Sequence, residues 1–174
     1  MENADWFMVA RIAHVIGVVL WIGGVAFVTT VLIPALRKLA DAEQRYQLFE
    51  KLERRFAMQA RVVTAITGLS GFYMVYVLDG WSRYSDPGFW WMHVMTLVWL
   101  LFSLVLFVFE PLFLHRWFRE QAGRNSDRAF GWLQVMHVVL LTVSLIAIVG
   151  AVAGSRGYRL FTEAALSIPL GGPC

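Results

Sequence analysis

Four stretches of this sequence carry no charged residue over lengths that can cross a lipid bilayer. They run from 12 to 36, 62 to 78, 87 to 109 and 129 to 155, which are 25, 17, 23 and 27 residues. A spanning helix needs about 20 predominantly apolar residues, and irregular backbone is not tolerated in lipid. The composition agrees, because 59% of the residues are hydrophobic and 16% are charged. The sequence predicts an all-α integral membrane protein, an antiparallel four-helix bundle.

The charges that separate these stretches predict the domain organisation. We expect one membrane domain over 1–174, with spans at about 8–35, 58–78, 88–112 and 130–154. Residues 37–57 are too charged to span, but their apolar residues recur near helical spacing. This segment therefore predicts an amphipathic cytoplasmic connection that extends the second helix.

The basic residues predict how the bundle is oriented. Of the 15, seven lie between 37 and 61 and four between 116 and 128, which leaves four elsewhere. The positive-inside rule places these two segments in the cytoplasm and both termini outside. We expect a multi-pass protein of the bacterial inner (cytoplasmic) membrane whose first partner is the lipid bilayer. Nucleic-acid binding is not expected, because the basic residues gather at helix ends and no DNA-binding motif accompanies them.

Histidines inside the apolar stretches are the main functional signal, because ionisable groups are costly at membrane depth. His14 and His93 lie near the starts of the first and third spans, which run in the same direction, so both face the outer leaflet. At about 1.5 Å per residue, His93 lies roughly 7 to 8 Å outward of the midplane and His14 roughly 15 Å. The depths nearly match if the first helix begins near Phe7 and ends before Pro34. The pair predicts one shared ligand.

The other two histidines belong to a different depth. His137 lies roughly 7 to 8 Å toward the cytoplasm, about 15 Å from His93, whereas two axial nitrogens of one iron are about 4 Å apart. Together with Gln134 and Ser144, it predicts a cytoplasmic-side pocket for a quinone headgroup or a proton path. His115 is interpreted as an interfacial residue. A second heme between His115 and His137 is the alternative.

The helix face that carries His14 predicts room for a flat ligand. Gly17, Trp21 and Gly24 follow it at +3, +7 and +10, so two residues without side chains flank an indole. Close packing of helices at small residues is the alternative explanation. Arg11 is expected to pair with a heme propionate or to lie at the membrane interface. With the two outer histidines, this face predicts one heme b, whose iron His14 and His93 would ligate.

Four short motifs carry a family resemblance over roughly residues 9 to 112. They are "LWIGGVAF", "FEKLERRF", "ITGLSGFYM" and "WWMHV", in this order. They resemble the first three helices of the small four-helix membrane proteins grouped with the copper-resistance protein CopD and the HemJ-type protoporphyrinogen oxidases. The fourth helix shows no matching motif.

The resemblance implies a b-type heme near the first-helix histidine and an important lysine on the third helix. His14 then takes the ligand position, Arg54 and Arg55 the arginine-bearing stretch, and His93 the third-helix histidine. Met95 stands at the lysine position, and a thioether cannot carry the charge of an ammonium group. The resemblance therefore implies a scaffold and a heme rather than a particular reaction.

Three classes of function stay open. The first is electron transfer by a heme b protein between a quinol or periplasmic donor and a redox partner protein or larger respiratory complex. The second is a heme-dependent oxidoreductase, such as a HemJ-like protoporphyrinogen oxidase. The third is noncatalytic, either CopD-like copper transport, for which Met92, His93 and Met95 supply soft ligands, or an accessory subunit. A homo-oligomer is compatible with each.

Overall fold

The computed structural model describes residues 2–39, 41–114, 120 and 125–157, and the structural statements below concern these residues. Four of the described helices are long and apolar enough to cross a membrane: Ala4–Leu36, Ala42–Val77, Pro87–Leu112 and Ser126–Ser155. The predicted all-α bundle with four transmembrane helices is confirmed.

Each span is one continuous helical rod, two of them with π-helical segments. The first consists of α1 (Glu2–Phe27), the π-helix η1 (Val28–Leu32) and α2 (Ile33–Leu36). The second is α3 (Ala42–Val77). The turns η2 (Gly80–Ser85) and η3 (Pro87–Phe89) lead into the third, α4 (Trp90–Leu104) and the π-helix η4 (Val105–Leu114). The fourth is α6 (Ser126–Ser155).

The segment expected to connect the first two spans belongs to α3 from Ala42 onward. The side chain of Asp41 caps this helix by accepting a hydrogen bond from the Glu43 amide at 3.0 Å. At about 1.5 Å per residue, 36 residues extend about 54 Å, well beyond the roughly 30 Å hydrocarbon core of a bilayer. The polar first half of α3 therefore extends out of the membrane as a helix.

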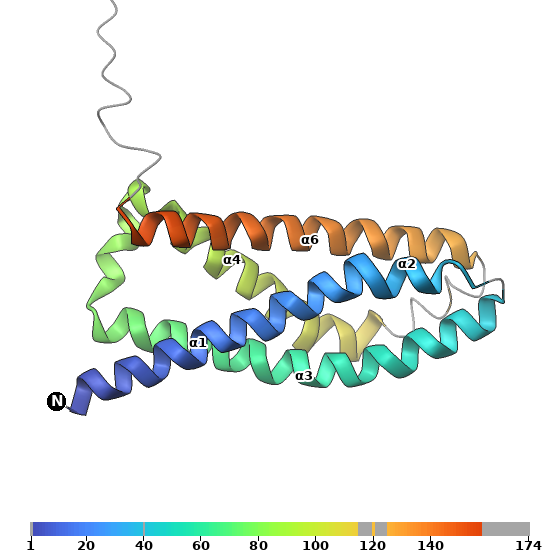
Figure 1. Cartoon of the computed structure of the whole chain (residues 1–174), viewed down its shortest axis with the longest axis horizontal. Coiled ribbons are helices and arrows are strands. Elements are labelled where there is room, and N and C mark those ends of the chain that lie inside the picture. Colours follow the sequence, from blue (N-terminus) through green and yellow to red (C-terminus); the bar gives the residue numbers. More distant parts are fainter. Residues whose placement is uncertain (1, 40, 115–119, 121–124, 158–174) are drawn as a thin grey trace, which may run out of the picture.

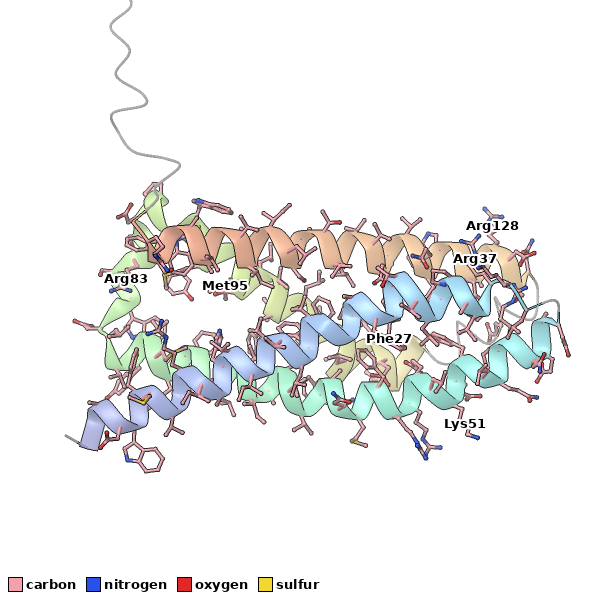
Figure 2. The ribbon with its side chains drawn as sticks, in the orientation of Figure 1. Phe27, Arg37, Lys51, Arg83, Met95 and Arg128 are labelled. Atoms are coloured by element: carbon pink, nitrogen blue, oxygen red, sulfur yellow. The ribbon has the colours of Figure 1, made fainter. Side chains whose placement is uncertain are left out.

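Neighbouring spans run in opposite directions along one long axis (Figure 1). The span of α1 packs chiefly against α3, and α4 packs chiefly against α6. Figure 2 shows Arg37, Lys51 and Arg128 at one end of the bundle and Arg83 at the other. Apolar side chains cover much of the outer surface, for example Leu69, Leu97 and Val149, each more than 60% exposed. Such a surface is suited to contact with lipid.

A proline accompanies each π-helix: Pro34 follows η1 by two residues, and Pro111 lies within η4. In a π-helix the N–H of a residue pairs with the carbonyl five residues earlier. Proline has no N–H, so Pro34 leaves the carbonyl of Thr29 without a backbone donor, and Pro111 does the same to the carbonyl of Leu106. A side chain from a neighbouring span replaces each donor. Gln134 Nε2 donates to Thr29 at 2.8 Å, and Arg61 Nε donates to Leu106 at 3.0 Å.

Candidate functional site

A cavity lies between all four spans at the end of the bundle that holds the start of α1. It has a volume of about 400 Å³, within the range of roughly 300 to 1,000 Å³ that is common for ligand sites. We call it the His14 cavity. The residues of its lining that matter below are Arg11, His14, Trp21, Arg83, Tyr84, Trp91, Met92 and Met95.

The ring of His14 is oriented by the main chain of α3. Its Nδ1 lies 2.8 Å from the carbonyl oxygen of Thr67 and 3.3 Å from the hydroxyl of Ser70. A carbonyl oxygen can only accept, so Nδ1 carries a proton and donates it to Thr67. In the neutral imidazole, Nε2 therefore keeps its lone pair. His14 is thus held in the tautomer that a metal-binding histidine requires.

Glycine at position 71 makes room for this ring. A Cβ atom built on Gly71 would lie 3.1 Å from Cε1 and 3.3 Å from Nδ1 of His14, which is closer than ordinary van der Waals contact. A side chain at this position would require the imidazole to shift by a few tenths of an ångström. Gly71 therefore positions His14.

The structure places His93 outside this cavity. Its side chain is exposed, and its ring meets the edge of the Tyr84 ring with the centroids 5.3 Å apart. His93 and His14 are therefore not brought together in one cavity. The reason is helical rotation, because consecutive residues point about 100° apart and the neighbouring Met92 is the one that points inward. Met92 is buried and Met95 is half-buried, and both line the cavity.

The three residues that follow His14 on its helix face, Gly17, Trp21 and Gly24, have two different roles: the glycines allow close helix packing, and Trp21 lines the cavity. A Cβ atom on Gly17 would collide with Oγ1 of Thr67, and one on Gly24 would collide with the ring of Phe56. These glycines let α1 approach α3 closely and do not line the cavity. Trp21 does line it. Its side chain is only 4% exposed, and its Nε1 donor is buried without a hydrogen-bond partner among the described residues.

Two guanidinium groups lie at the rim of the His14 cavity. Arg11, a predicted site residue, and Arg83, which the sequence analysis did not select, are both exposed and both line the cavity. Neither has a carboxylate partner in the described part of the chain. Arg83 is the only arginine in the short loop 79–86, and in the sequence it stands as an ordinary charged residue between two apolar stretches. The cavity thus opens toward two positive charges.

A second cavity of about 130 Å³ lies further along the bundle, and we call it the His137 cavity. His137 lines it, with Nδ1 placed 2.9 Å from the carbonyl oxygen of Leu133, so that Nε2 keeps its lone pair in the neutral ring. Trp21 is the one described residue that lines both cavities. The indole-bearing residue Trp21 is therefore a wall residue of both cavities.

The other residues predicted for the second site lie elsewhere. Gln134 binds the carbonyl of Thr29 and does not line the His137 cavity. Ser144 lines the His14 cavity and donates to the carbonyl of Leu140. His115 falls outside the described residues. The sequence did not indicate the buried residue Glu110, which lines the His137 cavity and whose carboxylate pairs with Arg61 at 2.9 Å.

Comparison with protein-family models, with curated protein sequences and with solved structures found no match to this chain. Among the described residues, no group of three or more His, Cys, Asp and Glu side chains is placed to hold a metal ion. A metal in the His14 cavity would have to be held by imidazole and thioether groups, or within a macrocycle.

Proposed function

We propose that the chain is a membrane-bound b-type heme protein that transfers electrons between a quinol or periplasmic donor and a redox partner. The observation that carries this proposal is the hydrogen bond from Nδ1 of His14 to the carbonyl of Thr67. Metal-binding histidines almost always donate their other ring N–H in this way, because the bond fixes the tautomer and the ring orientation. His14 would supply an axial ligand through Nε2.

The His14 cavity has properties that suit a heme. Its walls are mainly aromatic and aliphatic side chains, which suit the macrocycle. Arg11 and Arg83 lie at the rim, where guanidinium groups would bind the two propionates through charge-assisted hydrogen bonds. When bound, the heme supplies one-electron redox chemistry at its iron. The residues of the chain would orient it, neutralise its carboxylates and limit access of water.

A thioether from α4 would also help to hold the heme iron in this proposal. Met92 and Met95 are three residues apart on one helix face, and both line the His14 cavity. Helix α4 would have to rotate by about 100° around its axis for His93 to supply this ligand instead. Histidine with methionine is an established axial pair for heme iron.

Copper handling is the second candidate function. One imidazole, from His14, and two thioethers, from Met92 and Met95, line one cavity. Imidazole and thioether ligands suit Cu(I). The resemblance to CopD points in the same direction, and this donor set requires no macrocycle. Binding of Cu(I) that depends on both methionines, in a protein without a chromophore, would favour this candidate.

A tetrapyrrole oxidase is the enzymatic alternative. Arg11 and Arg83 would suit the carboxylates of a porphyrinogen as well as those of a heme. Met95, at the family's lysine position, lines the cavity but cannot supply a charge. Turnover of protoporphyrinogen by the purified protein would distinguish this alternative from electron transfer. A protein that lacks chromophore, turnover and Cu(I) binding would be an accessory subunit.

The deciding experiment is an absorbance spectrum of the detergent-purified protein, oxidised in air and then reduced with dithionite. We expect a Soret band and sharp reduced α and β bands, which His14→Ala removes. His93→Ala is the matched control, because this histidine lies outside the cavity, and it should leave the spectrum unchanged. A colourless protein after growth with added heme precursor would overturn the proposal.

A further inference from the structure

Residues of all four spans line the His137 cavity, and most of them are apolar. The cavity is smaller than a heme would need. At about 130 Å³ it has about a third of the volume of the His14 cavity. Ala57 and Ala60, both buried, form part of its wall, and Trp132, 63% exposed, lies where it reaches the outside of the bundle. This volume is too small for a second heme and leaves room for a single small ring.

The polar groups that line this cavity indicate which hydrogen-bonding groups a ligand should carry. Nε2 of His137 presents a lone pair, because Nδ1 donates to the carbonyl of Leu133. Glu53 and Glu110 also line the cavity, and the carboxylate of Glu110 pairs with Arg61. An acidic lining does not favour an anionic ligand such as a fatty acid. An uncharged ligand that donates a hydrogen bond would meet an acceptor instead.

Trp21 lines this cavity as well as the His14 cavity. Its indole is 4% exposed, and its N–H has no hydrogen-bond partner among the described residues. A buried unsatisfied N–H is costly, so it is suited to a ligand oxygen. A phenolic oxygen can donate one hydrogen bond and accept others, which matches an imidazole acceptor and an indole donor.

We propose that the His137 cavity binds the ring of a lipid-soluble hydroquinone, with one ring hydroxyl donating to Nε2 of His137. The apolar tail would leave past Trp132 toward the lipid. As the electron donor of the heme, this ligand rests on the proposed function. As a ligand of this cavity, it rests only on His137, Trp21 and the wall residues.

The test is calorimetric titration of the full chain, in detergent and without oxygen, with a decyl-substituted benzohydroquinone. We expect saturable binding that His137→Leu weakens by about tenfold or more, the loss expected for one hydrogen bond to a buried acceptor. Ala57→Leu should abolish binding by filling the cavity. His93→Leu is the matched control and should bind as the unchanged protein does. Decanoate should not compete.

Two further measurements keep the result decisive. Thermal unfolding identifies a variant that has lost its fold, and His137→Gln, whose amide oxygen still accepts, should then bind better than His137→Leu. The oxidised quinone, which cannot donate, should bind several-fold more weakly than the hydroquinone. Absence of saturable binding, equal affinity for both redox forms, or binding that neither His137→Leu nor Ala57→Leu changes would overturn the proposal.

The absorbance spectrum of the same samples separates this proposal from the heme. A colourless protein that binds hydroquinone through His137 would overturn the heme and support the hydroquinone site. A pigmented protein that shows no such binding would overturn the hydroquinone site alone.

Discussion

Arg61 donates from Nε to the main-chain carbonyl of Leu106, 3.0 Å away, and this is the carbonyl that Pro111 leaves without a backbone donor. The same guanidinium pairs through its NH2 group with Glu110 at 2.9 Å. One side chain of α3 therefore satisfies both a main-chain acceptor and a buried carboxyl group of η4. This contact joins the second span to the third at η4, where Pro111 removes a backbone hydrogen bond.

Removing this guanidinium should destabilise the bundle strongly. Arg61→Leu takes away the donor to Leu106 and the charge that faces Glu110, whose side chain is 7% exposed. Loss of one partner of a buried ion pair costs about 3 to 5 kcal/mol. Thermal unfolding in detergent measures it, and Arg55→Leu, at an exposed position of the same helix, is the control. The double variant with Glu110→Leu should recover much of the loss, and equal destabilisation of control and variant would contradict this account.

The contribution of Gln134 to the stability of the fold should depend on Pro34, which has no backbone N–H to donate to Thr29. We expect Gln134→Leu to destabilise the protein by about 1 to 3 kcal/mol, because the buried carbonyl of Thr29 loses its donor. Pro34→Ala restores a backbone N–H that can reach this carbonyl. Gln134→Leu should therefore cost less in the Pro34→Ala background, and a double-mutant cycle of unfolding free energies measures the difference. Simple additivity of the two changes would show that the two groups do not serve the same acceptor.

Gly71 should be sensitive to a single methyl group. We expect Gly71→Ala to displace the imidazole of His14 and to reduce the Soret absorbance of the purified protein by several-fold. Gly23→Ala is the matched control, because a Cβ atom there meets nothing within 4 Å. It should leave the spectrum intact and stabilise the helix by up to about 1 kcal/mol, since alanine is the better helix former. Similar spectra of both variants would contradict a positioning role for Gly71.

A thioether ligand on α4 predicts a specific change of spectrum. Either Met92→Leu or Met95→Leu should convert sharp six-coordinate bands to the broad bands of a five-coordinate heme and leave heme content nearly unchanged. Met58→Leu, at a residue 61% exposed and away from the cavity, should have no effect. The reduced-minus-oxidised spectrum is the measurement. A six-coordinate spectrum in the double variant Met92→Leu/Met95→Leu would exclude both thioethers as ligands.

The four spans could be predicted from the sequence because lipid imposes a simple condition on length and polarity. The expectation that His14 and His137 belong to different sites agrees with the structure, in which they line different cavities. The direction in which a side chain points could not be derived, because it depends on how each helix is rotated against its neighbours. That rotation turns Met92 inward and His93 outward. It also directs Gly17 and Gly24 at α3.

Arg83 and Glu110 were missed for a related reason. Both interrupt or flank apolar stretches, so the sequence presents them as boundaries of spans. Only the fold shows that the loop with Arg83 returns over the His14 cavity and that Glu110 turns inward to Arg61. A charge that ends an apolar stretch can thus be part of a site.

The bond between Gln134 and Thr29 has a consequence for the order in which the protein is made. The two residues are 105 positions apart, on the first and the last spans. A ribosome delivers α1 to the membrane long before α6, and in that interval the carbonyl of Thr29 lies in lipid without its partner, a state that costs several kcal/mol. The first helix therefore reaches its final state only when the last one is inserted. A chain that stops before α6 would lack this donor and keep the unpaired carbonyl.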